Sequence, residues 1–442
     1  MARTMDDEDI DKTARVARDL IRLDTTNFGD GKSNGEADAA EYVSAALTEL
    51  GLEPQLFESE PGRVSVVARV EGSHDGSDGS ERGALVVHGH LDVVPATPEN
   101  WSVDPFEGVI QDDMLWGRGA IDMKNTDAMI LTALQDILGA DKRPARDLVI
   151  AFFADEEDGG LLGSHYLVKE HPEVFAGATE AIGEVGGYSI TLADQRAYLL
   201  QTGEKALVWI KLIARGPSAH GSRLLHNNAV TRLAEAVARI GRRDWPIRLT
   251  YATAELLLEI ATMLGHDPQQ VGPDELAIAT GSASGFIQAS LRTTTNPTAF
   301  TAGHKHNVVP DIAEALVDVR TLPGREESTL AEIRELVGPD IEVVVMHQDV
   351  GLENEFSGPL IDAATAALQK NDPGARVLPY LFPGGTDNKA LSKLGIAGYG
   401  FAPLKLPETL DFPSLFHGVD ERVPLDALVF GRQVLTDFLL EY

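Results

Sequence analysis

Side chains that can bind metal ions or transfer protons follow three apolar runs in this sequence. One run ends at His90 and Asp92, a second ends at Glu156 and Glu157, and a third ends at Glu184. Apolar runs of this length, bounded by glycine or proline, are typical of buried strands in a parallel sheet. Because functional groups gather outside the carboxyl ends of such strands, we expect these side chains to share one edge.

Two further candidates lie in loops. Asp122 follows Gly117 and Gly119, which allow a tight backbone turn, and His417 lies near the carboxyl end. The candidate metal ligands are therefore His90, Asp122, Glu157, Glu184 and His417. Two imidazoles and three carboxylates suit two divalent ions if one carboxylate bridges them.

Two choices stay open on spacing alone. Glu156 and Glu157 are adjacent, so one would be a ligand and its neighbour a general base that takes a proton from water. His88 and His90 share one face of their strand, so alternation does not decide which of them binds metal. Asp92 is close enough in sequence to orient a metal-bound histidine.

Composition narrows the possibilities. The chain has 442 residues, which suggests two domains, and its net charge of −32 argues against nucleic-acid binding. It contains no cysteine, so a metal must be held by His, Asp and Glu, which suits Zn²⁺, Mn²⁺ or Co²⁺. The acidic amino terminus lacks the apolar core of a signal peptide, and no apolar run is long enough for a membrane span. We expect a cytoplasmic protein.

The order of predicted elements indicates an α/β fold with a mostly parallel sheet flanked by helices. We assign residues 1–201 and 320–442 to this discontinuous catalytic domain, and 202–319 to an inserted α+β domain. The insertion is predicted from an alternating strand at 205–215, a helix at 227–240, and strands at 285–292 and 314–320. From residue 326 the α/β pattern returns, with a helix at 328–337 and a strand at 341–347. A polar loop at 72–80 contains His74, which we expect to be solvated.

The motifs together resemble those of the M20 metallopeptidases, which include glutamate carboxypeptidase, aminoacylase-1, acetylornithine deacetylase and succinyl-diaminopimelate desuccinylase. The matching stretches occur in the family's order and span nearly the whole chain. They are His88–Pro95, Trp116–Lys124, Ala154–Asp158, Gly183–Gly187, Gly216–Ser222 and His417–Glu421.

The resemblance implies a role for each matching residue. His90 and Glu184 would hold one metal ion, Glu157 and His417 the other, and Asp122 would bridge them. Asp92 would orient His90, Glu156 would be the general base, and His88 would be a core residue. The ions would be zinc, with cobalt or manganese as alternatives. The peptide bond after Asp122 would be cis.

The resemblance also implies that the inserted domain is a ferredoxin-like lid and the dimerisation domain. His220 would stabilise the oxyanion of the tetrahedral intermediate, reaching the active site of the other subunit of a homodimer. Substrate contacts would come from Asn307, Arg320, Gly385 and Thr386, with Arg320 receiving a carboxylate. Relatives often read Gly-Gly-Thr-Asp-Ala-Arg, whereas this chain has Asn388 and Lys389, so substrate choice is where the resemblance says least.

We therefore expect a dinuclear hydrolase that cleaves the amide bond of a small peptide or an N-acyl amino acid with a free carboxylate. A carboxypeptidase or dipeptidase is slightly favoured, because no segment specifies an acyl pocket. An N-acyl-amino-acid deacylase of the aminoacylase or desuccinylase type is the main alternative. A metal-binding homologue without catalysis is a remote one. No membrane or nucleic-acid partner is expected.

Overall fold

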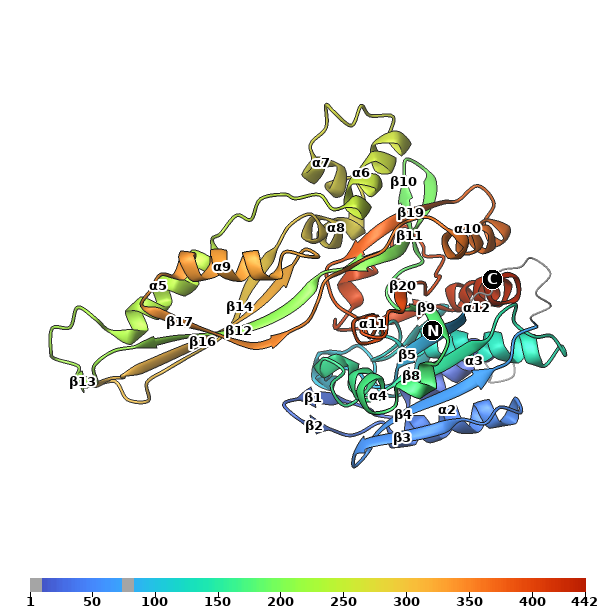
Figure 1. Ribbon diagram of the computed structural model, residues 1–442, viewed down its shortest axis with the longest axis horizontal. Helices are drawn as coiled ribbons and strands as arrows, with labels where there is room; N and C mark the ends of the chain where they lie inside the picture. The colour runs from blue at the N-terminus through green and yellow to red at the C-terminus, as the bar shows by residue number, and fades with distance from the viewer. Residues whose placement is uncertain (1–9, 74–82) are drawn as a thin grey trace.

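The fold is built around a large mixed sheet. The computed structural model describes residues 10–73 and 83–442, so His74 lies outside the described residues. Eight strands follow one another in the order β10-β11-β20-β9-β5-β8-β4-β3, and β18 and β19 also pair with β11 (Figure 1). These strands are β3 (Gln55–Glu60), β4 (Arg63–Val70), β5 (Ala84–His90), β8 (Leu148–Phe153), β9 (Ala178–Gly183), β10 (Tyr188–Leu192), β11 (Gln195–Glu204), β18 (Leu352–Glu353), β19 (Arg376–Phe382) and β20 (Ala397–Gly400).

The prediction of a mostly parallel sheet holds for its central strands and for the pair β11–β19, but not for the other pairs. Strand β5 pairs in parallel with both β8 and β9, and β20 pairs in parallel with β9. The pairs β3–β4, β4–β8, β10–β11 and β11–β20 are antiparallel. Short connections join β3 to β4 and β10 to β11, and strands joined in this way can pair only as antiparallel hairpins.

Helices cover both faces of the central strands, which explains their unbroken apolar sequences. In β8, Ile150 and Phe152 pack into a core with one set of helices, while Val149 and Ala151 pack with another set. The first set is α1 (Lys12–Ile21), α2 (Ala37–Glu49), α3 (Lys124–Leu138), α10 (Pro359–Asn371) and α12 (Leu425–Glu441). The second set is α4 (Ser164–Glu170) and α11 (Asn388–Ser392). No helix of residues 10–73 or 83–442 has both the length and the apolar character needed to cross a membrane.

A second, antiparallel sheet has the strand order β14-β16-β12-β17. It contains β12 (Ala206–Arg215), β14 (Thr294–Ala302), β16 (Ile312–Thr321) and β17 (Ile341–Gln348), with α5 (Ala229–Gly241) and α9 (Glu326–Val337) packed on one face. The chain order is strand, helix, strand, strand, helix, strand. Helix α9 and strand β17 belong to this sheet and its helical layer although they lie beyond the predicted boundary at residue 319. Their apolar residues complete the core beside β12.

The segment between α5 and β14 also differs from the prediction. It forms α6 (Tyr251–Met263), α7 (Pro273–Ile278) and α8 (Ser284–Ser290), so the strand expected at 285–292 is a helix and the strand begins at Thr294. Leu256, Ile260 and Ile287 belong to the core of the large sheet, and α6 packs against β19 (Figure 1). The sequence places this segment in the insertion, but its apolar faces are buried by the first sheet.

Candidate active site

The candidate ligands meet at one edge of the large sheet. His90 is the last residue of β5 and pairs in register with Phe153, the last residue of the neighbouring β8. The chain then forms a 3₁₀ turn, Glu156–Asp158, and Glu184 directly follows β9. Because β5 runs parallel to both β8 and β9, their carboxyl ends bring these residues together, as predicted.

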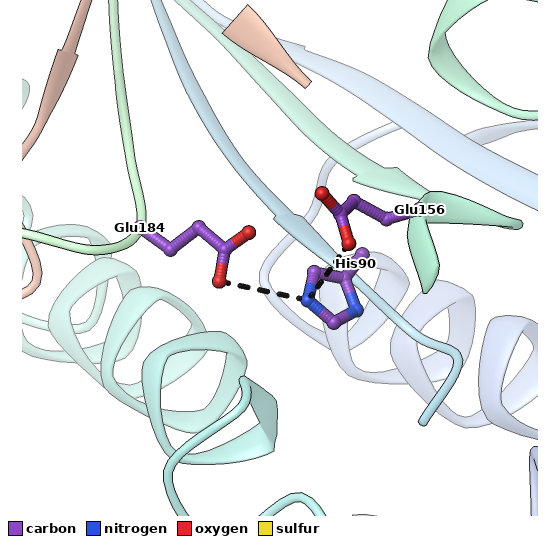
Figure 2. A group of neighbouring side chains, drawn as sticks. All are labelled: His90, Glu156 and Glu184. Atoms are coloured by element: carbon purple, nitrogen blue, oxygen red, sulfur yellow. Dashed lines mark ion pairs between the residues drawn. The ribbon is translucent and has the colours of Figure 1, made fainter. Parts of the chain in front are cut away.

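The turn after β8 sends its two glutamates in different directions. The Oε2 atom of Glu156 lies 4.0 Å from His90 Nε2, and Glu184 Oε2 lies 3.6 Å from the same nitrogen. Figure 2 shows both carboxylates pointing toward the His90 ring. Glu157 instead approaches His417, with 3.1 Å between Oε2 and Nε2. Asp155 begins the turn with a φ of 68°, the left-handed region in which an aspartate is more common than most residues.

Asp122 lies between the two imidazoles. Its Oδ1 atom is 3.2 Å from His90 Nε2, and its Oδ2 atom is 3.2 Å from His417 Nε2. The peptide bond between Asp122 and Met123 is cis, which confirms the prediction, and the bond between Glu184 and Val185 is also cis. The two oxygens of the Asp122 carboxylate thus face different histidines. A ligand that bridges two metal ions requires this arrangement.

Glu421 fixes the loop that carries Asp122. This buried carboxylate accepts hydrogen bonds from the backbone N–H groups of Gly119, Ile121 and Asp122, at 3.2, 2.7 and 3.2 Å. It also pairs with Arg118 at 2.6 Å. The sequence predicted no role for Glu421, although its position four residues after His417, in the matching stretch His417–Glu421, was a signal for one.

Asp92 holds the glutamate turn as well as facing His90. Its carboxylate accepts hydrogen bonds from the backbone N–H groups of Glu156 and Glu157, at 3.1 and 3.2 Å, and from Asn27 Nδ2 at 2.9 Å. The His90 Nδ1 atom lies 3.6 Å from the Asp92 carboxylate but 3.0 Å from the Asp92 carbonyl oxygen. Asn27 was not predicted, because it lies in a short strand near the start of the chain, β1 (Asn27–Gly29), which carries no ligand motif.

The electrostatics of the cluster suit a cation. Burial and neighbouring carboxylates raise the pKa of Glu156 and of Glu157, and burial raises the pKa of Glu184 to about 8. Burial lowers the pKa of His417, but hydrogen bonds with Asp122 and Glu157 outweigh it and raise that pKa to about 11. Four crowded carboxylates face two imidazoles, and the buried Oε1 atom of Glu157 has no hydrogen-bond partner among the described residues. Nitrogen and oxygen donors of this kind fit divalent zinc, cobalt or manganese.

The geometry alone does not show which glutamate, Glu156 or Glu157, is a metal ligand and which is the general base. Ligand atoms of His90, Glu156 and Glu184 lie close enough to surround one ion, and so do those of His90, Asp122 and Glu157. His88 is excluded: it is buried and its Nε2 atom lies 3.0 Å from Asn388 Oδ1, so it is the core residue that was predicted. Burial lowers the pKa of His88 to about 4.

A cavity of about 460 Å³ opens beside the cluster. Arg320, Gly385 and Thr386, the residues expected to contact substrate, line this cavity, and Asp318 pairs with the Arg320 guanidinium at 2.8 and 3.0 Å. His220 and Asn307 lie elsewhere: His220 ends the short strand β13 (Ala219–His220), and Asn307 directly precedes its partner strand β15 (Val308–Val309). Strand β13 lies at the far end of the second sheet (Figure 1). Within one chain, therefore, the predicted contact of these two residues with the site is not made.

Comparison with known proteins shows which family the chain belongs to. The model of peptidase family M20/M25/M40 matches residues 86–441. The chain belongs to this family. The N-fatty-acyl-amino acid synthase/hydrolase PM20D1 of Homo sapiens is 28% identical over 94% of this chain and 86% of its own length. Aminoacylase-1 of Mus musculus is 23% identical over 91% of this chain and 89% of its own length.

A solved structure agrees on the fold of this M20 hydrolase. The M20 family metallo-carboxypeptidase from Sulfolobus solfataricus has a TM-score of 0.75 and 19% identity, and the likeness covers 97% of this chain and 99% of that one. The likeness extends over both sheets, so the second sheet is part of the shared architecture.

Proposed function

We propose that this M20 hydrolase uses two divalent metal ions to cleave the amide bond of an N-acyl amino acid or a small peptide with a free carboxylate. The observation that carries the proposal is the position of Asp122, whose two oxygens face His90 and His417 separately. His90 and Glu184 would hold one ion, and Glu157 and His417 the other. Zinc is the expected metal, with cobalt and manganese as alternatives.

In this proposal Glu156 moves the protons. When bound, the ions would lower the pKa of a water molecule and polarise the substrate carbonyl. Glu156 takes the proton of the attacking water and returns it to the leaving nitrogen. Asp92 keeps Glu156 and Glu157 in place through their backbone N–H groups. Burial and the neighbouring Glu184 carboxylate raise the pKa of Glu156, which favours its taking up a proton.

His220 completes the site in a homodimer. It is exposed, and its nearest polar partner is the hydroxyl group of Ser222, 2.8 Å from Nδ1. An exposed imidazole at the far end of the second sheet is placed to enter the cavity of a second subunit and stabilise the oxyanion there. Asn307, whose backbone oxygen accepts a hydrogen bond from Gly221, would arrive with it. The second sheet would then serve as both lid and dimerisation domain.

N-acyl amino acids are the favoured substrate class. Sequence reasoning slightly favoured peptides because no acyl pocket was recognised, but aromatic and aliphatic side chains line much of the cavity. The relatives named for N-fatty-acyl amino acids and for aminoacylase activity align over more than 90% of the chain. Arg320 would receive the carboxylate by exchanging its pairing with Asp318.

A substrate panel tests the proposal. Dipeptides, N-acetyl, N-succinyl and longer N-acyl amino acids are assayed with Zn²⁺, Mn²⁺ and Co²⁺, in wild type and in Glu156→Ala. We expect hydrolysis of N-acyl amino acids that a chelator abolishes, and a fall of about 10²–10⁴-fold in kcat for Glu156→Ala.

Asp158→Asn, in the same turn but outside the cavity lining, is the matched control and should keep wild-type activity. Undiminished hydrolysis in pure Glu156→Ala protein would overturn the mechanism. Tight metal binding without hydrolysis of any substrate would favour the non-catalytic alternative.

A further inference from the structure

Helix α8 contributes to the active-site cavity from an unexpected part of the chain. It lies between α5 and β14 in sequence, yet it packs on the core of the large sheet. Phe286 and Ala289, three residues apart on one helix face, line the cavity. Ile287 and Ser290 are buried. The helix therefore presents one face to the core and another to the space where substrate would bind.

Phe286 joins an aromatic wall next to the metal-binding cluster. Its ring centroid is 6.0 Å from that of Phe382 and 6.0 Å from that of Phe416. Phe416 directly precedes the candidate ligand His417. The side chains of Leu207 and Trp209, from β12, line the same cavity. The wall thus brings apolar residues of the two sheets and of α8 together around the cavity.

Lys205 fixes the position of α8. Its side chain is fully buried, and Nζ donates hydrogen bonds to the backbone oxygens of Ala289 and Arg292, at 3.0 and 2.9 Å, and to Thr294 Oγ1 at 3.1 Å. A lysine at the carboxyl end of a helix satisfies carbonyl groups that have no partner within the helix. Lys205 lies in the chain between β11, of the large sheet, and β12, of the second sheet. Its hydrogen bonds therefore tie α8 to the junction of the two sheets, and this holds Phe286 and Ala289 at a fixed place in the cavity.

We infer that α8 determines which acyl groups this hydrolase accepts, with Phe286 and Ala289 receiving the end of an unbranched apolar acyl chain. The inference rests on the proposed amide hydrolysis. Each methylene group of the substrate that an apolar wall buries should raise the binding affinity about four-fold. Chain length should therefore raise kcat/KM until the acyl group reaches α8.

Two substitutions of opposite sense test the inference on zinc-loaded protein. The substrates are N-acetyl, N-butanoyl, N-octanoyl and N-dodecanoyl derivatives of one amino acid. Ala289→Leu fills the space, so we expect kcat/KM to fall at least ten-fold for octanoyl and dodecanoyl substrates and to stay within two-fold for acetyl. Phe286→Ala enlarges the space, so the preferred chain should become longer. Leu258→Ala, at an exposed position on α6, is the matched control and should leave the profile unchanged.

A binding measurement separates this inference from the proposed hydrolysis. Calorimetric titration with octanoate and with acetate reports the apolar wall even in protein that hydrolyses nothing. If octanoate binds more tightly than acetate and Ala289→Leu removes the difference, α8 lines the acyl site whether or not the hydrolysis proposal survives. If hydrolysis occurs but both substitutions change all chain lengths by the same factor, α8 does not select the acyl group.

Discussion

The edge of the large sheet and the far end of the second sheet both carry candidate catalytic residues, but only the first is assembled within one chain. At the sheet edge, Asp122 lies 3.2 Å from each of two histidines in a largely buried cluster. At the far end, His220 is exposed and pairs with Ser222. Parallel strands bring their carboxyl ends together by necessity, whereas a residue at a distant tip would need a second subunit, as we propose, to reach the site.

The sharpest test of this contrast concerns His220. In His220→Ala we expect kcat to fall by about 10²–10³-fold, because the oxyanion loses a positioned donor. Mixing His220→Ala with Glu156→Ala protein should restore about a quarter of wild-type activity, since a mixed dimer forms one intact site.

The control for this experiment is His226→Ala, which removes another exposed histidine near the same loop and should keep its activity. Full activity of a strictly monomeric protein, or no recovery on mixing subunits that do exchange, would contradict a role for His220 in the neighbouring subunit.

A smaller effect is expected at the sheet edge from Asp92→Asn. The change removes the negative charge of a carboxylate that faces His90 and accepts hydrogen bonds from the backbone N–H groups of Glu156 and Glu157. Metal affinity should fall by about 10–100-fold, measured by competition with a chelator. At saturating metal much of the activity should return. Unchanged metal affinity would mean that Asp92 does not support the ligand residues.

The smallest effect on activity is expected at Glu204, where the two sheets join. Burial raises the pKa of Glu204 to about 7 although the Lys389 charge opposes the rise. The folded protein therefore keeps a proton that the unfolded chain loses between pH 4.5 and 7, and stability falls as the pH rises through this range. Glu204→Gln should raise the free energy of unfolding by up to about 3 kcal/mol at pH 8 and leave it unchanged near pH 4.5.

Urea unfolding at pH 5 and pH 8 measures this difference. Activity against short substrates should stay within two-fold of wild type, since Glu204 is not among the residues lining the cavity. A gain in stability of equal size at both pH values would show that the ionisation of Glu204 is not its cause.

Much of the large sheet could be predicted because its strands are short apolar runs between clear turn signals. The three apolar runs predicted to end beside the candidate ligands form strands β5, β8 and β9. Less could be predicted for residues 251–290. Their apolar helical faces give no indication of which sheet buries them, and the expected strand at 285–292 is α8 instead.

The sequence by itself determined the candidate site residues and their common edge, since His90 ends one apolar strand and Glu156, Glu157 and Glu184 follow two others. Only the tertiary structure decided how that edge is held and what surrounds it. Asn27 reaches Asp92 from 65 residues away, and Glu421 reaches the Asp122 loop from almost 300. Phe286 joins the cavity through a helix that sequence order assigns to the other sheet. Contacts of this kind depend on how distant segments of the chain pack and on which sheet buries each helix face. A local pattern of residues does not predict either.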